Sequence, residues 1–218
     1  MSSSHLWVAA TTFGSVHVTD SVLSSSVGGT PLVQLTKVVP DGCGTVWLKM
    51  ESVNPTGSYK DRMAVAVLGR AIQRGDVRPG DRVVEYTGGS TGTALAFVAA
   101  RLGLRFVAVS SDAFSEAKLS SMRAYGAEVI VEESEGGAIT PELIGRMKSR
   151  AQELVSEEGC FYTDQFGSPD VLVGYEPMGV EIADQTGGAV DVICAGVGTG
   201  GALMGAVNGL DGKGVHPD

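Results

Sequence analysis

The sequence predicts an α/β fold in which a mostly parallel sheet is covered by helices on both faces. From residue 60 onward, apolar runs of strand length alternate with segments whose apolar residues recur at helical spacing. Glycine and proline separate these segments, and the connections are short. Strands that alternate with helices in this way are joined by right-handed crossovers, which produce a parallel sheet.

The first predicted helix begins at Lys60 and ends at Gly75, and its apolar residues share one face: Ala64, Val65, Leu68, Ala71 and Ile72. Pro79-Gly80 then turns the chain into a strand through Val83 and Val84. The next predicted helix ends at Gly103 and buries four residues: Leu95, Val98, Ala99 and Leu102. Such stripes are typical of core faces, so we assign them no chemical role.

Three further elements follow in the same alternation. We expect a strand over 104–109, a helix over 115–125 stopped by Gly126, and a strand over 127–131. Thr140 and Pro141 then offer an N-cap and a favoured first residue for another helix. The acidic, glycine-rich residues 132–137 between them are interpreted as a solvated loop.

Composition and charge exclude several classes of function. The chain has 218 residues, 43% of them hydrophobic, and a net charge of −9. Nucleic-acid and anionic-membrane partners require clustered Lys and Arg, so the sequence argues against both, and any bound anion must be held locally. No apolar run approaches the ~18 residues of a membrane span. The opening residues lack the basic start and apolar core of a secretory signal, and we interpret residues 1–21 as a leader.

The cysteines and acidic residues give no sign of a metal site. Cys43, Cys160 and Cys194 form an odd set without metal-like spacing, and we expect them to be buried, reduced thiols in a cytoplasmic protein. Glu85 has no partner at a useful spacing and is interpreted as structural or solvent-facing.

Lys60, in the segment NPTGSYKDR over 54–62, is the most informative position for chemistry. A lysine framed by a turn and a following helix is suited to hold an aldehyde cofactor as a Schiff base, which indicates pyridoxal phosphate. Taken alone, a lysine near a turn is more often a solvated surface charge, so the interpretation depends on other segments.

Two glycine-rich turns support the cofactor hypothesis. Residues 87–92, TGGSTG, follow a strand-like run and precede a helix, and residues 196–201, GVGTGG, follow a strand predicted over 191–195 and precede an apolar helix. In this context backbone N–H groups can converge on an anion. Close packing of small residues is the alternative explanation for each turn taken singly.

In this order and spacing, the three segments resemble the fold-type II pyridoxal-phosphate enzymes, the tryptophan synthase β superfamily. The resemblance is greatest to the cysteine synthase and cystathionine β-synthase branch, and it extends over nearly everything after residue 27. Further similar segments are GGTPLV at 28–33, MRAYGAEV at 122–129 and YTDQF at 162–166.

The resemblance implies two open, mostly parallel α/β domains with the cofactor in the cleft between them. Residues 49–157 would form the smaller, mobile domain, and residues 22–48 with 158–218 would form the larger one. Members of the family continue well beyond the position of Asp218, so we expect the large domain to be incomplete at its C-terminal side.

The resemblance also implies roles for individual residues. Lys60 would bind the cofactor covalently and move the substrate Cα proton. The cofactor phosphate would be held by the glycine loop: Gly196, Val197, Gly198, Thr199, Gly200 and Gly201. The substrate carboxylate would be received by five residues: Thr87, Gly88, Gly89, Thr91 and Gln165.

The resemblance also implies contacts of two residues, Ser90 and Asn54, with the cofactor 3′ oxygen. Ser90 stands where many members of the family have asparagine, and we expect this change to tune the contact rather than abolish it. Asn54 resembles a second contact to the same oxygen, but a role as turn former before Pro55 is equally consistent with the sequence.

The implied reaction is β-elimination and β-replacement on an activated serine, O-acetylserine or O-phosphoserine. Sulfide or a thiol would add to an α-aminoacrylate to give cysteine, and the GVGTGG loop with the Gln165-Phe166 pair favours this over the threonine dehydratases. The alternatives are a serine or threonine deaminase, and an inactive truncated paralogue or partner-completed subunit. Because relatives are commonly dimers, we expect a homodimer.

Overall fold

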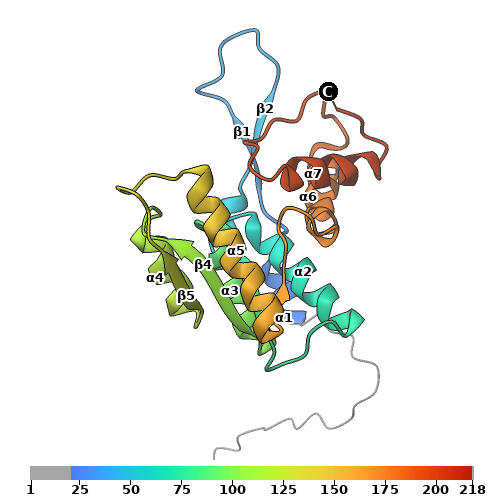
Figure 1. Cartoon of the computed structure of the whole chain (residues 1–218). Helices are drawn as coiled ribbons and strands as arrows, with labels where there is room; N and C mark the ends of the chain where they lie inside the picture. Colours follow the sequence, from blue (N-terminus) through green and yellow to red (C-terminus); the bar gives the residue numbers. More distant parts are fainter. Residues whose placement is uncertain (1–20, 218) are drawn as a thin grey trace, which may run out of the picture.

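The computed structural model describes residues 21–217, so nearly all of the expected leader, residues 1–21, lies outside the described residues (Figure 1). The elements run in this order: α1 (Ser21–Ser26), β1 (Leu32–Leu35), β2 (Val46–Lys49), a 3₁₀ helix (Glu51–Val53), α2 (Lys60–Arg74), β3 (Arg82–Tyr86), α3 (Ser90–Leu102), β4 (Arg105–Ser111), α4 (Glu116–Ala124), β5 (Glu128–Glu132), α5 (Pro141–Glu158), β6 (Phe161–Tyr162), α6 (Asp170–Thr186) and α7 (Gly201–Asp211). The alternation expected from the sequence is confirmed.

Four strands form a parallel sheet in the order β5-β4-β3-β6. Val84 pairs with Val107 across β3 and β4, and Val83 pairs with Phe161 across β3 and β6. Because β6 belongs to this sheet, the sheet continues beyond the domain boundary expected at 157/158.

Helices cover both faces of the sheet. Alternate residues of a strand point to opposite faces, and accordingly Val83 packs with buried residues of α2 and α3 whereas Val84 packs with Leu143 and Met147 of α5. The apolar stripes assigned to the core are buried or half-buried as expected. The predicted α/β fold is therefore confirmed.

The helix ends follow the signals in the sequence. Gly75 and Gly103 end α2 and α3 in the left-handed conformation, with φ of 80° and 71°, a region that L side chains rarely adopt. Thr140 caps α5 because its hydroxyl accepts a hydrogen bond from the Leu143 amide at 3.2 Å.

The N-terminal strands form a separate antiparallel pair. β1 and β2 pair in register from Leu32–Lys49 to Leu35–Val46, and they project away from the parallel sheet (Figure 1). Trp47 and Leu48 of this pair are exposed.

α7 packs on α6 at unusually close range, and α6 in turn packs on α2, so both helices lie away from the sheet (Figure 1). Gly201, Gly205 and Gly209 recur every fourth residue and so lie on one face of α7. A Cβ at Gly205 would lie 2.6 Å from the Leu172 carbonyl oxygen, and one at Gly209 would overlap the Glu176 carbonyl. The glycines therefore allow the two backbones to touch.

Two expectations, for the strand over 191–195 and for the cysteines, are wrong. Residues 191–195 do not form a strand, because no described strand pairs with them and Val192 is 67% exposed. Cys43 and Cys194 are exposed, and only Cys160 of the three free cysteines is buried. Cys194 is exposed because the strand that was expected to bury it does not form.

Among residues 21–217, no helix combines the length and the apolar character needed to cross a membrane.

The close contact between α6 and α7 predicts opposite effects of the same substitution at two helical glycines. Gly209→Ala should lower the free energy of unfolding by about 2–3 kcal/mol, because the added methyl overlaps the α6 backbone. Gly145→Ala on α5 is the matched control and should raise it by about 0.5–1 kcal/mol, since that Cβ meets no atom within 4 Å. Urea unfolding of both variants tests this, and equal effects would contradict the packing described.

Candidate cofactor and substrate site

A buried arginine holds the start of α2. The Arg62 guanidinium donates two hydrogen bonds to the Glu51 carboxylate, at 2.7 and 2.8 Å, and two to the Glu181 carboxylate, both at 2.8 Å. Burial opposes ionisation of Glu181, but hydrogen bonds from Arg62 and Lys49 hold its pKa at about 2. The network joins the N-terminal segment, α2 and α6, and so fixes where Lys60 stands.

Asn54 belongs to this network. Its side-chain oxygen accepts from the Gly28 amide at 2.9 Å, and its amide nitrogen donates to the Glu51 carbonyl and carboxylate at 3.0 and 2.9 Å. Both amide hydrogens are thus engaged. This arrangement favours the structural alternative for Asn54 over a cofactor contact.

Lys60 is the first residue of α2, and its side chain is half-buried. Its Nζ lies 5.2 Å from the centroid of the Tyr59 ring. Burial lowers the pKa of Lys60 below its usual value, and the nearby Glu85 carboxyl partly opposes this. A lower pKa increases the fraction of neutral amine, which is the nucleophilic form.

The glycine loop over 196–201 leads into α7. No atom would lie within 4 Å of a Cβ at Gly196, Gly198 or Gly200, so the loop is open on that side. The Thr199 hydroxyl accepts from the Gly201 amide at 3.4 Å. The first amides of α7 have no intrahelical acceptor and carry the positive end of the helix dipole, as an anion site requires.

Tyr175 of α6 lies between the residue before Lys60 and the end of the glycine loop. The Tyr59 and Tyr175 rings meet edge to face with centroids 5.8 Å apart. Tyr175 also lies against the start of α7, since its Cε2 would be 3.6 Å from a Cβ at Gly201. The two segments predicted to share a cofactor therefore contact the same buried side chain.

The second glycine turn joins β3 to α3. The Thr87 hydroxyl accepts from the amides of Gly89 and Gly92, both at 3.2 Å. Its own proton and the first amides of α3, at Ser90 and Thr91, form no hydrogen bond with another residue among 21–217. These groups provide donors at a helix N-terminus, where a carboxylate binds favourably.

Gln165 lies next to this turn although it is 74 residues from Thr91. The Thr91 hydroxyl donates to the Gln165 side-chain oxygen at 2.8 Å, and the Gln165 amide nitrogen donates to the Tyr86 carbonyl at 3.2 Å. The structure thus brings together Thr91 and Gln165, two residues that the sequence assigned to one carboxylate site.

Two residues that the sequence did not single out cover the same turn. A Cβ at Gly88 would overlap the Phe114 ring, and one at Gly89 would lie 2.8 Å from the Lys118 Nζ. The Phe114 ring leaves room only for glycine at position 88, whereas the flexible end of Lys118 could move away from a side chain at position 89. Nothing in the spacing of Phe114 and Lys118 indicated this contact.

Glu85 is a buried carboxyl whose hydrogen-bond partners the sequence did not reveal. One oxygen accepts from the Thr163 hydroxyl at 2.7 Å and the Gln165 backbone amide at 2.9 Å. Burial raises the pKa of Glu85 to about 7, although these hydrogen bonds favour the ionised form. Its position on the buried face of β3, two residues after Val83, was the available signal.

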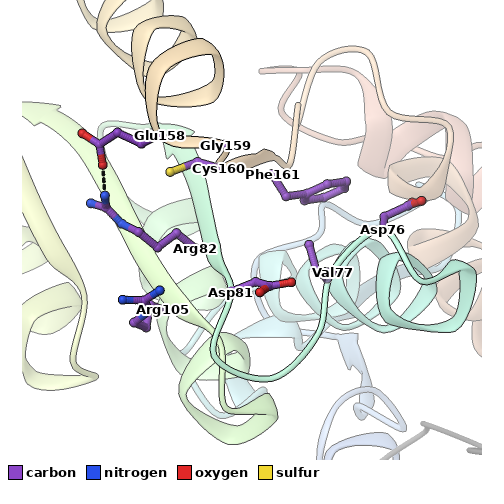
Figure 2. A pocket seen from close by; sticks show the side chains of 9 residues that line it. All are labelled: Asp76, Val77, Asp81, Arg82, Arg105, Glu158, Gly159, Cys160 and Phe161. Carbon is purple, nitrogen blue, oxygen red and sulfur yellow. Dashed lines mark ion pairs between the residues drawn. The ribbon is translucent and has the colours of Figure 1, made fainter.

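A cavity of about 390 Å³ lies at the amino ends of the parallel strands. Its lining includes Arg82, Arg105 and Phe161, the first residues of β3, β4 and β6, and Arg82 forms an ion pair with Glu158 there (Figure 2). Ligands of parallel α/β sheets bind beyond the carboxyl ends of the strands. The cavity is therefore separate from the two glycine turns.

The residues present fit pyridoxal phosphate. A half-buried lysine with a lowered pKa could hold the aldehyde, and an open glycine loop at a helix start could hold the phosphate. Tyr175 brings these two parts together. The overall charge of −9 is no obstacle, since helix-end amides supply the local positive field.

Comparison with known proteins agrees with this fit. Residues 23–218 match the family model described as "Pyridoxal-phosphate dependent enzyme". The chain is 39% identical over 186 residues to cysteine synthase B of Escherichia coli (strain K12), covering 85% of this chain and 59% of that protein. Cysteine synthase of Staphylococcus aureus (strain Mu50 / ATCC 700699) is 39% identical over 188 residues, covering 84% and 58%.

Solved structures give the same result. Cysteine synthase from Entamoeba histolytica superposes with a TM-score of 0.78 at 29% identity, over 96% of this chain and 61% of that one. O-ureido-L-serine synthase superposes with a TM-score of 0.78 at 34% identity, over 89% and 60%. The chain thus spans about three fifths of the length of these relatives. The resemblance and the cofactor expected from the sequence are confirmed.

The raised pKa of Glu85 predicts a pH dependence of stability. Between pH 4.5 and about 7 the unfolded carboxyl ionises while the folded one stays protonated, so the free energy of unfolding should fall by roughly 2–3 kcal/mol as the pH rises. Asp164, Tyr86, Tyr162 and Lys60 are the titratable groups around it. Glu85→Gln should remove this decline in chemical denaturation from pH 4.5 to 8, and an identical slope in both proteins would refute it.

Proposed function

Because the chain belongs to the pyridoxal-phosphate-dependent enzyme family, we propose that it takes part in β-replacement on an activated serine, with sulfide or a thiol as the incoming group and cysteine as product. The observation that carries this proposal is that Tyr175 contacts both Tyr59, the residue before Lys60, and Gly201, the last residue of the 196–201 loop. The cysteine synthases among its relatives support the reaction class. O-acetylserine and O-phosphoserine are the candidate substrates.

Lys60 would act as the base in this reaction. Bound pyridoxal phosphate supplies an electron sink for the charge that develops at the substrate Cα. The Lys60 amine, once free, would accept the Cα proton, and burial, by lowering its pKa, favours the neutral form that can do so. Burial of the lysine also limits the access of water to this amine.

The turn over 87–92 would orient the substrate through its α-carboxylate. The Thr87 hydroxyl and the Ser90 and Thr91 amides offer donors, whereas the Thr91 hydroxyl already donates to Gln165. A carboxylate that takes the place of the Gln165 oxygen would release this hydroxyl as a further donor. Gln165 would then bind the same carboxylate through its amide nitrogen.

A division into two domains is part of the proposal. We propose that residues 49–157, with β6 added, form a mobile substrate domain, and that 22–48 with the rest of 158–218 belong to a cofactor domain. α2 would link the two, since it contacts both α3 and α6. A homodimer is part of the same proposal.

A partner-completed subunit is the second candidate, and a specific observation favours it. Val192 and Val197, on either side of the glycine loop's start, are 67% and 68% exposed. Contiguous exposed apolar surface beside a ligand loop can mark a site that another polypeptide covers, and Met204 of α7 is exposed as well. The deaminase alternative has no such observation in its favour, but product analysis separates it from the proposed reaction.

The proposed role of Lys60 predicts a visible absorption band in protein incubated with pyridoxal phosphate. Lys60→Ala should abolish the lysine-dependent band, and Lys148→Ala, on the exposed part of α5, should leave it unchanged. O-acetylserine should then alter the spectrum of wild type, and sulfide should yield cysteine. An unaltered spectrum would refute the proposed reaction, and pyruvate or 2-oxobutyrate released without a thiol would indicate the deaminase.

A further inference from the structure

Tyr175 carries a buried hydroxyl without a partner. The residue is fully buried, and its hydroxyl forms no hydrogen bond with any described residue. Leaving such a group unpaired in a protein interior destabilises the fold, so an unpaired buried hydroxyl calls for an explanation. Apolar packing explains the ring, which contacts Met63, Val67 and Val171, but it does not explain the hydroxyl.

The side chain of Tyr175 runs along α7 toward the start of that helix. A Cβ at Gly205 would lie 2.5 Å from the Tyr175 Cβ, whereas a Cβ at Gly201 would lie 3.6 Å from the Tyr175 Cε2. Gly201 is one turn closer to the N-terminus of α7 than Gly205. The hydroxyl, beyond the ring, therefore lies near the level at which the glycine loop enters the helix.

The Tyr175 ring is also close to the start of α2. The Tyr59 ring packs edge to face on Tyr175, and Lys60 Nζ lies 5.2 Å from the Tyr59 centroid. Burial raises the pKa of the Tyr175 phenol, so the hydroxyl stays protonated and can donate a hydrogen bond. A neutral donor is suited to an anion held at the N-terminus of a helix.

We propose that the Tyr175 hydroxyl donates a hydrogen bond to the cofactor phosphate, in addition to the backbone amides of the 196–201 loop. The proposal rests on the placement of the cofactor between Lys60 and α7 given above. The otherwise unpaired hydroxyl would gain its partner only when the phosphate binds. Tyr175 thus couples cofactor binding to the packing of α6 on α7.

Tyr175→Phe tests this role because it removes the hydroxyl and keeps the ring. In protein without cofactor, the free energy of unfolding should stay unchanged or rise, since the lost group had no partner. The dissociation constant of pyridoxal phosphate, measured by equilibrium dialysis, should rise about tenfold. Pyridoxal, which lacks the phosphate, should bind both proteins equally.

Ser110→Ala is the matched control, because Ser110 carries the other buried hydroxyl that has no partner among the described residues. It lies on β4, and its removal should leave the binding of pyridoxal phosphate unchanged. Equal weakening of pyridoxal and pyridoxal phosphate by Tyr175→Phe would overturn the phosphate contact. Lower stability of Tyr175→Phe without any loss of affinity would overturn it as well.

Inorganic phosphate, used as a second probe, separates this inference from the proposed function. If Tyr175→Phe weakens phosphate binding while Lys60→Ala leaves the affinity for pyridoxal phosphate unchanged, the result supports the phosphate contact and contradicts the role of Lys60. If wild type shows the Lys60-dependent band but Tyr175→Phe binds pyridoxal phosphate normally, only the inference about Tyr175 falls. Failure of wild type to bind either probe would overturn both.

Discussion

The buried Arg62 guanidinium, shared between Glu51 and Glu181, is the interaction on which the candidate site depends. Arg62 is 4% exposed, so its charge must be matched locally, and the two carboxylates do this with four hydrogen bonds. Removing either carboxylate would leave a buried charge partly unpaired. Because Arg62 is two residues from Lys60, the same contacts fix the direction in which α2 presents its lysine.

The network of Arg62, Glu51 and Glu181 is linked to the glycine loop through α6. Glu181 anchors α6 to Arg62, and glycine contacts then set α7 directly on α6. Tyr175, also on α6, fills the space between the two helix starts. The lysine and the loop are thus positioned by one rigid helix rather than by flexible connections. Rigid support of this kind is what a covalently held cofactor with an anchored phosphate requires.

Local features of the fold could be predicted from the sequence because local physics decides them. Gly75 and Gly103 end helices since only glycine adopts their backbone conformation without cost, and Thr140 caps α5 by its hydroxyl. The strand expected over 191–195 failed because strand formation depends on a pairing partner, which no local pattern reveals. The exposure of Cys194 follows from the same cause.

The candidate site was predictable where a motif carried the chemistry, as at Lys60 and the two glycine turns. It was not predictable where distant residues meet. Arg62 and Glu181 are 119 positions apart, and Glu85 meets Gln165 across 80, so neither pair has a signature in spacing. Asn54 lies within the lysine motif, and the sequence was consistent with either a cofactor contact or a role in the turn. In the structure its side-chain amide hydrogen-bonds Gly28 and Glu51.

The central claim is that Lys60, and no other lysine, reacts with pyridoxal phosphate. Borohydride reduction of protein incubated with the cofactor, followed by proteolysis and mass spectrometry, tests this most directly because reduction makes the bond permanent. The structure predicts the added mass on the peptide that contains Lys60, since burial lowers the pKa of this amine. Label spread over exposed lysines such as Lys118 and Lys148, with Lys60 unmodified, would contradict it.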